Sequence, residues 1–326
     1  MKQTSETGKA AEYEIKRRSR RSGKRGFRAA VLLLTLVLCA GLLAACGGSD
    51  SSSDSGGKAA KEEKVTMRVA AYKGVGTAIT GKLRGDYKIT SYSEPAKMEA
   101  ALRRGSYDAA ILPTASADNL YGRAGGGLIE VSPASRGGMH LVSCGYVTSS
   151  TRFSALAGKT IYVSGANTTD RRVFDALMTE AGIGSASYKI KVLKSCSEVE
   201  KALRDEGNIA VLSEPYYSSF KKKNSSITDL FDLGSEWQKA TDTELVGDAV
   251  VVRRGFWKKH PGAFEDFCDD MTEAVKDADS AADLVFYGQS DRGARLLEHF
   301  NDYLYQQAPA SFAGGRPGSR LYETVQ

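Results

Sequence analysis

The chain has few of the residue types that build disulfide frameworks or metal centres. Its 326 residues include five cysteines and three histidines, and these are widely separated. No two cysteines have zinc-ligand spacing, and no histidine has a second ligand type beside it in a recognisable pattern. Scattered thiols in odd number are also not a disulfide framework. We therefore expect no metal and no cofactor, and a buried, small-hydrophobe role for Cys144, Cys196 and Cys268.

A long hydrophobic run is missing too. The longest apolar stretch, residues 29–42, has about 14 residues, whereas a helix that spans a membrane needs about 20. Residues 1–45 contain ten Lys or Arg against three Glu, and small residues follow the apolar stretch. This succession is typical of a secretory signal, so we predict that residues 1–45 are removed.

The signal ends in Leu43-Ala44-Ala45-Cys46, which resembles a bacterial lipobox. There, a peptidase cuts before a thiol that already carries diacylglyceryl. The motif predicts lipidation of Cys46 and an extracytoplasmic protein held to the cell membrane by a lipid anchor. Removal of the signal changes the net charge from +6 to −1, so the basic pI belongs to the signal. Nothing in the remaining chain predicts a nucleic-acid partner.

Residues 46–64 are rich in Gly, Ser and charged residues and cannot bury apolar surface. We predict a flexible tether there and a folded domain from about Val65. Strand-like and helix-like segments then alternate, which predicts an α/β fold with largely parallel sheets. The expected strands are 66–72, 87–92, 109–112, 128–131, 139–143, 160–163, 188–193, 209–212 and 248–253. The expected helices are 94–104, 169–181, 197–204, 261–275, 281–287 and 292–303, with a capping box formed by Ser197 and Glu200.

Two similar α/β halves followed by a helical block predict two lobes. Residues 65–145 would begin lobe 1, residues 146–248 would form lobe 2, and residues 249–326 would complete lobe 1 and add C-terminal helices. The chain would cross near 143–146 and return near 245–250. About 260 folded residues suffice for two cores, and the cleft between them is the default ligand site.

Candidate ligand-binding residues lie in the loops after the strands, because ligands of open α/β sheets sit beyond the carboxyl ends of strands. Glycines there permit close backbone approach, and two helix N-termini would suit an anionic group or a polar heteroatom. The alternative is that the Thr and Asn side chains only cap helices. The candidates in these loops are Lys73, Gly74, Gly76, Thr77, Pro113, Thr114, Ser116, Asn167, Thr168 and Thr169.

Five segments, taken in order, resemble one family of proteins. They are Lys73-Gly74, residues 107–114, residues 156–163, residues 165–169 and Leu212-Ser213-Glu214-Pro215. Over about residues 65–285 the chain is similar to the nitrate, taurine, sulfonate and thiamine-precursor class of substrate-binding lipoproteins of ABC importers. The resemblance implies a two-lobed type II periplasmic-binding-protein fold, a clamshell that closes over a small solute by a hinge motion. It also implies a monomer whose partners are ABC permease subunits.

The resemblance places Glu214 on the cleft-facing edge of the second lobe. A carboxylate there could accept from an amine or ring nitrogen, or it could cap the following helix. Tyr216 and Trp237 could stack on a planar ligand, although aromatic residues more often pack in a core. The family's frequent Gly-Pro-Thr-Gly after the first strand is replaced here by residues 74–77, so the ligand class stays open between nitrate, sulfonate and pyrimidine-like solutes.

Two other functions fit the same fold. One is a lipoprotein sensor domain for a signalling partner, which needs the same clamshell. The other is an enzyme similar to the pyrimidine synthase relative, which requires a Cys-rich iron-binding run together with an active-site Lys and His. This chain has no such Cys run and no recognisable Ser-His-Asp or paired-carboxylate arrangement, so we expect a protein that is not an enzyme.

Overall fold

The computed structural model describes residues 65–123, 127–145, 152–165, 168–278, 283–288 and 290–307. They belong to one compact unit, Glu63–Gln326. The predicted signal, the lipidation site Cys46 and the tether lie outside the described residues. Across the described part, no helix has both the length and the apolar character that a membrane crossing requires.

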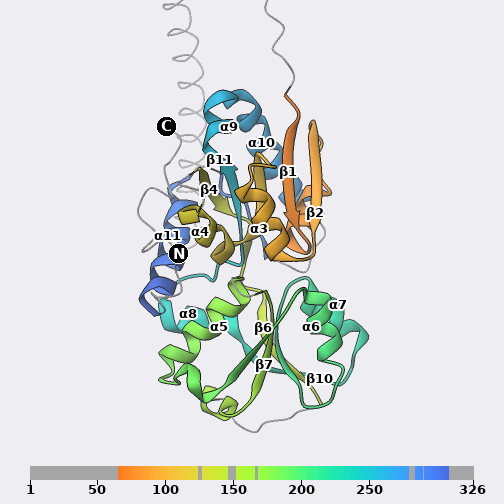
Figure 1. The fold of residues 1–326 in the computed structure, drawn as a ribbon, viewed down its shortest axis with the longest axis vertical. Helices are drawn as coiled ribbons and strands as arrows, with labels where there is room; N and C mark the ends of the chain where they lie inside the picture. Colours follow the sequence, from red (N-terminus) through yellow and green to blue (C-terminus); the bar gives the residue numbers. More distant parts are fainter. Residues whose placement is uncertain are drawn as a thin grey trace, which may run out of the picture. The chain divides into compact units, whose positions relative to one another are not determined.

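The first of two five-stranded sheets has the order β2-β1-β3-β11-β4 (Figure 1). β1 pairs in parallel with β2 and β3, and β11 runs antiparallel between β3 and β4. The strands are β1 (Met67–Tyr72), β2 (Tyr87–Tyr92), β3 (Ala109–Pro113), β4 (Leu128–Pro133) and β11 (Asp248–Arg253). Alternate residues of β1 enter different apolar clusters, Val69 on one face and Ala70 on the other, so this sheet is covered on both faces. The associated helices are α2 (Val75–Thr80), α3 (Pro95–Arg103), α4 (Thr114–Arg123), α9 (Arg254–Lys259) and α10 (Pro261–Asp277).

The second sheet has the order β10-β6-β9-β7-β8. β7 is parallel to β8 and β9, and β6 is antiparallel to both β9 and β10. The strands are β6 (Met139–Cys144), β7 (Thr160–Ser164), β8 (Lys189–Leu193), β9 (Ile209–Ser213) and β10 (Ile227–Asp232). The helices here are α5 (Thr169–Glu180), α6 (Cys196–Ala202), α7 (Tyr216–Lys223) and α8 (Leu233–Thr241), with short 3-10 turns at Phe153–Leu156 and Ser185–Ser187. In each sheet a single strand opposes the others, so the predicted mostly parallel α/β architecture is confirmed.

Two chain segments connect the sheets and pair with each other. The first runs through β5 (Ser135–Arg136), and the second runs from Leu245 to Gly247. Arg136 and Val246 form an antiparallel bridge, and the Gly137 amide donates to the Leu245 carbonyl at 2.8 Å. The crossing expected near 143–146 is therefore wrong, because β6 already belongs to the second sheet. Its pairing partners are more than 60 residues away in sequence, which no local pattern indicates.

Helix α11 (Asp291–Gln307) contacts both halves of the unit: β4 and α4 of the first, and α5 of the second. Its apolar face carries Leu297, Phe300 and Leu304 into the core cluster of the second sheet. On the side of the first sheet, Asn301 donates to Glu130 of β4 at 3.3 Å. The predicted C-terminal helix thus belongs to both lobes.

Three other local predictions differ from the structure. Residues 281–287 were expected to be helical, but Asp283–Leu284 form β12, which pairs with β5. The expected capping box of Ser197 and Glu200 is wrong, because the helix is capped two residues earlier: Ser195 accepts from the Glu198 amide, and Glu198 accepts from the amide of Lys194 and not from that of the N-cap residue. β10 and α8 were not anticipated, and neither were the six-residue helices α2 and α9.

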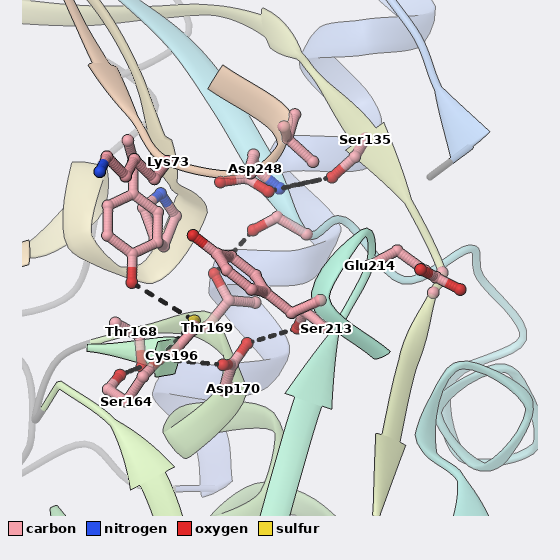
Figure 2. Close-up of a pocket in the computed structure, with 18 of the residues that line it drawn as sticks. Lys73, Ser135, Ser164, Thr168, Thr169, Asp170, Cys196, Ser213, Glu214 and Asp248 are labelled. Carbon is pink, nitrogen blue, oxygen red and sulfur yellow. Dashed lines mark hydrogen bonds between the residues drawn. The ribbon is translucent and has the colours of Figure 1, made fainter. Parts of the chain in front are cut away.

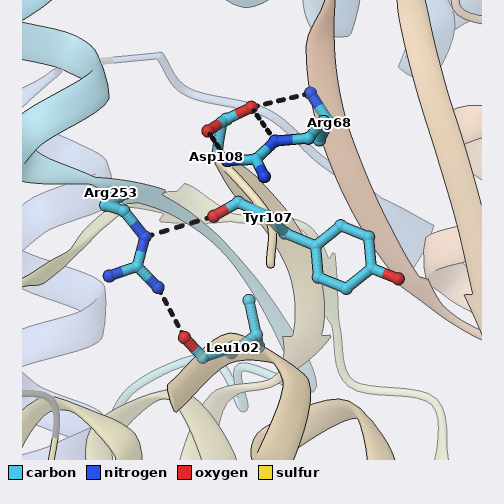
Figure 3. Close-up of polar contacts among 5 residues, drawn as sticks. All are labelled: Arg68, Leu102, Tyr107, Asp108 and Arg253. Atoms are coloured by element: carbon cyan, nitrogen blue, oxygen red, sulfur yellow. Dashed lines mark hydrogen bonds and ion pairs between the residues drawn. The ribbon is translucent and has the colours of Figure 1, made fainter. Parts of the chain in front are cut away.

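Polar contacts hold the first sheet together at the end of β1, β3 and β11 that lies away from Tyr72, Pro113 and Asp248 (Figure 3). Arg68 of β1 makes an ion pair with Asp108 at 2.7 Å. Arg253, the last residue of β11, donates to the carbonyl oxygens of Tyr107 and Leu102 and so satisfies the end of α3. Because these contacts tie three strands and a helix together, they stabilise the register that places the opposite strand ends side by side.

Candidate functional site

A narrow cavity of about 30 Å³ lies between the two sheets, at the ends of their strands. It is lined from the first sheet by the ends of β1 and β3 and the start of β11, and from the second by the ends of β7 and β9 and the starts of α5, α6 and α7. Both connecting segments also contribute. A volume of this size accommodates ordered water but no metabolite, so the structure represents a closed arrangement of the two halves.

Two aspartates lie on opposite sides of this cavity (Figure 2). Asp170, in the first turn of α5, accepts hydrogen bonds from Ser213 at 2.6 Å and from Ser164 at 3.3 Å. Asp248, at the start of β11, accepts from Ser135 at 3.2 Å, and its own amide donates back to the same hydroxyl at 3.0 Å. The two carboxyl groups therefore come from different halves of the fold and are positioned by short serine side chains.

Burial is the main influence on both carboxyl groups. It raises the pKa of Asp248 to about 7, and the neighbouring Asp170 adds to the rise. Burial likewise raises the pKa of Asp170, against the opposing effect of hydrogen bonds from Ser213 and Ser164. Taking a carboxylate out of water disfavours its charged form, so both groups retain protons at higher pH than free aspartic acid does.

Cys196 and Tyr72 form the wall beside Asp170. The Tyr72 hydroxyl lies 3.7 Å from the Cys196 sulfur, and the Cys196 thiol donates to Ser164 at 3.4 Å. Burial raises the pKa of Cys196 to about 12. The nucleophilic form of cysteine is the thiolate, so this residue is an inert, uncharged part of the wall.

Gly74 allows the two halves to approach closely at the mouth of the cavity. Its φ of 108° is unfavourable for residues with a side chain, and a Cβ atom at this position would lie 3.2 Å from the Tyr216 ring. Tyr216 opens α7 and is partly exposed. The loop after β1 and the start of α7 therefore meet over the cavity because position 74 has no side chain.

The structure brings together about half of the candidate residues. Those that line the cavity are Lys73, Gly74, Pro113, Thr168, Thr169, Glu214 and Tyr216. Thr77 faces a separate, more open depression, and Asn167 lies outside the described residues. Gly76, Thr114 and Ser116 are buried and do not line this cavity.

The threonines at the helix starts make contacts other than the expected caps. Thr168 precedes α5 without capping it and donates instead to the Ser164 carbonyl at 2.6 Å. Thr169 and Thr114 both donate to the Gly247 carbonyl. These hydroxyl groups are used to connect parts of the chain.

Glu214 is occupied by its own helix. Its carboxylate accepts from the amide of Ser218 at 3.2 Å and from the hydroxyl of the same residue at 2.6 Å. Figure 2 shows its side chain turned away from Asp170 and Asp248. Of the two alternatives open at this residue, the geometry therefore favours the helix-capping carboxylate.

Trp237 is a core residue, so of the two roles left open for it the geometry favours packing. Its side chain is 0% exposed and packs against Phe300 and Tyr303 of α11 at centroid distances of 5.1 and 4.9 Å. It lies on the buried face of α8 and does not line the cavity.

Sequence reasoning missed the two aspartates and the wall beside them. Asp170 and Asp248 had a usable signal, because each lies at the junction of an expected strand or helix with a loop. The polar and aromatic residues that line the cavity and were not predicted include Tyr72, Ser135, Ser164, Asp170, Cys196, Ser213 and Asp248. Among the residues with described positions, no group of three or more His, Cys, Asp or Glu is arranged to hold a metal ion.

Solved structures of the same fold include several binding proteins. An ABC transporter protein from Parabacteroides distasonis is 18% identical with a TM-score of 0.59, over 81% of this chain and 100% of that one. The periplasmic aliphatic sulphonate binding protein from Escherichia coli is 13% identical with a TM-score of 0.58, over 80% and 92%. The alkanesulfonate-binding protein from Xanthomonas axonopodis pv. citri, bound to MOPS, is 13% identical with a TM-score of 0.59, over 78% and 96%. These likenesses establish the type II periplasmic-binding-protein fold.

No curated protein matches the sequence. A family model described as menaquinone biosynthesis matches residues 82–314, which include most of both sheets and the connections between them. Because this match covers well over half of the 326 residues, the chain belongs to that family of periplasmic-binding-protein-like domains.

Proposed function

We propose that this chain is an extracytoplasmic binding lipoprotein that captures a small polar solute between its two halves and delivers it to an ABC permease. The observation that carries the proposal is the cavity lined by residues of both sheets, which are joined by two paired segments. A cavity that neither half forms alone opens and closes with their relative motion, which is how hinged receptors admit and retain a solute.

The connecting segments have the properties of a hinge. Gly137 and Gly138 both have positive φ values, 54° and 61°, and lie where the first segment enters β6. Such positions tolerate backbone rotations that other residues resist. Because the closed cavity has room only for water, solute entry requires a rotation of this kind.

The anchor is proposed from the lipobox motif, and the permease partner from the resemblance to binding proteins of importers. Lipidation at Cys46 and a tether over residues 46–64 would hold the domain near the membrane and leave it free to tumble beside the permease. The matching solved structures include binding components of importers, which supports transport over sensing. We propose a monomer without catalytic activity, because the two halves of one chain already enclose the site.

Thermal unfolding of the purified domain, residues 58–326, tests the binding function. A solute that binds only the folded state raises the free energy of unfolding, by about 2.7 kcal/mol at a concentration of 100 times Kd. Tm rises with it. We expect at least one small polar metabolite in a broad panel to raise Tm and to be recovered unchanged. A panel that leaves Tm unmoved would contradict the proposal.

The anchor has its own test. In cells of the source organism, the full-length protein should fractionate with membranes, and Cys46→Ala should release it or leave the signal uncleaved. Cys39→Ala, which changes a cysteine inside the predicted signal, is the matched control and should remain with membranes.

An enzyme is the second candidate, favoured by the description of the family and by two carboxyl groups with raised pKa. A protonated and an ionised carboxyl on opposite sides of a solute can act as general acid and base. Incubation of the protein with each solute that raises Tm, followed by mass spectrometry of that solute, separates the two functions. A product that forms in proportion to enzyme concentration and disappears in Asp170→Asn would establish catalysis.

A further inference from the structure

We propose that the cavity accepts a solute with a cationic nitrogen, such as an alkylammonium, an amidinium or a guanidinium group, and excludes sulfonate and nitrate. The proposal rests on the binding function above and specifies its substrate class. It follows from the charges that line the cavity and from the contacts in which each is already engaged.

The cationic side chains that line the cavity either already form ion pairs or are exposed at its mouth. Arg136 donates one terminal nitrogen to Glu244 at 3.0 Å and the other to Asp283 at 2.7 Å. Lys73 is exposed at the mouth. No described cationic side chain makes an ion pair or hydrogen bond with Asp170 or Asp248, so the inner surface has two carboxyl groups without a counter-charge.

Those carboxyl groups also have unused acceptor capacity. A carboxylate offers about four lone-pair positions. Asp170 receives donors from two serine hydroxyls, and Asp248 receives one from Ser135. A ligand with several N–H donors would fill the remaining positions, and charge-assisted bonds of this kind are the strongest available.

The helix start that could have attracted an anion is already occupied. The Asp170 carboxyl lies in the first turn of α5. An acidic side chain at this position offsets the positive end of the helix. An incoming sulfonate would therefore find this helix start already occupied by a carboxyl group, which the earlier expectation of an anion site did not foresee.

Aromatic groups complete a surface suited to a cation. Tyr72 and Tyr216 line the cavity from the two halves. Tyrosine rings attract cations through their electron-rich faces, whereas they offer a nitrate only one hydroxyl donor each. The Tyr72 hydroxyl is already in contact with Cys196.

Cation binding should release protons. The other titratable and charged groups that line the cavity are Tyr72, Lys73, Arg136, Cys196, Glu214 and Tyr216, of which Glu214 is turned away from the two aspartates. Burial raises the pKa of both tyrosines and of the cysteine, so these stay neutral near pH 7. A bound cation favours the ionised carboxylates, so affinity should increase from pH 6 to pH 8 as Asp248 loses its proton.

Calorimetry with probes paired by shape tests the assignment. The pairs are guanidinium and nitrate, benzamidinium and benzoate, and ethylammonium and ethanesulfonate. We expect binding of at least one cation and of none of the anions. Asp170→Asn and Asp248→Asn should each weaken that binding by about 30-fold or more. Asp269→Asn, which changes an exposed carboxylate of α10, should leave it unchanged.

The Asn variants should fold, since buried carboxyl groups with raised pKa are close to neutral before substitution, and retained cooperative unfolding verifies this. Mass spectrometry of small molecules released by denaturing the purified protein gives a second reading, and a released cation supports the proposal. Binding of an anionic probe, or release of an anionic solute, overturns the cation assignment and leaves the binding function intact. No bound probe and no released solute would overturn both.

Discussion

The Thr169 hydroxyl donates a 2.7 Å hydrogen bond to the carbonyl oxygen of Gly247. Thr169 begins α5 beside the second sheet, and Gly247 lies where the chain returns to the first. The same carbonyl accepts from the amide of Thr114 at 3.2 Å and from its hydroxyl at 3.3 Å. One oxygen atom thus joins the second half, the first half and the segment that connects them.

Replacement of Thr169 by Val should therefore weaken the closed arrangement. The hydroxyl is buried and also accepts from the Ala115 amide at 3.4 Å, so its loss leaves a buried donor and a buried acceptor with fewer partners. We expect a loss of about 1–3 kcal/mol in the free energy of unfolding, measured by urea denaturation. Thr169→Ser retains the hydroxyl and should recover most of that loss. Equal stability of the Val and Ser variants would contradict the assigned contact.

Stability should fall as pH rises from about 4 to about 7. Burial raises the pKa of Asp118 to about 7, and it raises the pKa of Glu130 well above its usual value. In this window the folded state holds protons that the unfolded state has lost, so each unit of pH favours unfolding. The stabilisation is complete below the unfolded pKa and is lost as pH passes through the folded one.

Thermal unfolding of Asp118→Asn and wild type at pH 5, 6, 7 and 8 measures this contribution. The wild type should lose more stability between pH 5 and pH 7 than the variant, by at most roughly 1.4 kcal/mol for each unit of pH. Parallel curves for the two proteins would show that Asp118 does not titrate in this range.

Trp237 should matter for stability and not for binding. Trp237→Ala removes a fully buried ring and should cost about 3–5 kcal/mol. Trp237→Phe should cost roughly 1–2 kcal/mol, since most of the volume stays and the buried Nε1 donor, which has no hydrogen-bond partner, is removed. Calorimetry with the Phe variant should give the wild-type Kd. A tenfold weaker Kd in this folded variant would restore the stacking role.

Gly74→Ala should destabilise the closed arrangement. Alanine resists a φ of 108°, and its methyl group would press on the Tyr216 ring. We expect a cost of about 1–3 kcal/mol in unfolding free energy, together with weaker solute binding. Gly255→Ala is the matched control, since nothing lies within 4 Å of its added Cβ and it is helical. That control should be neutral or slightly stabilising.

The sequence by itself determined most of the strands and the longer helices, and their order. Strands β2 and β11 have the predicted bounds, because apolar residues and turn residues mark them locally. The rule that sites lie beyond strand ends also placed Lys73, Gly74 and Pro113 at the cavity, since each directly follows or ends a strand. These predictions depend on neighbours within a few residues, which a sequence pattern records.

Only the tertiary structure decided which groups meet. Whether Trp237 faces a ligand or a core depends on α11, more than 50 residues later, and β6 belongs to the second sheet because β9 and β10 pair with it. Asp170 and Asp248 are 78 positions apart and face one cavity because the paired connecting segments bring the two halves together. An aspartate has the same chemical structure at every position in a sequence. Its burial, its hydrogen-bond partners and its pKa depend on the residues that the fold places around it.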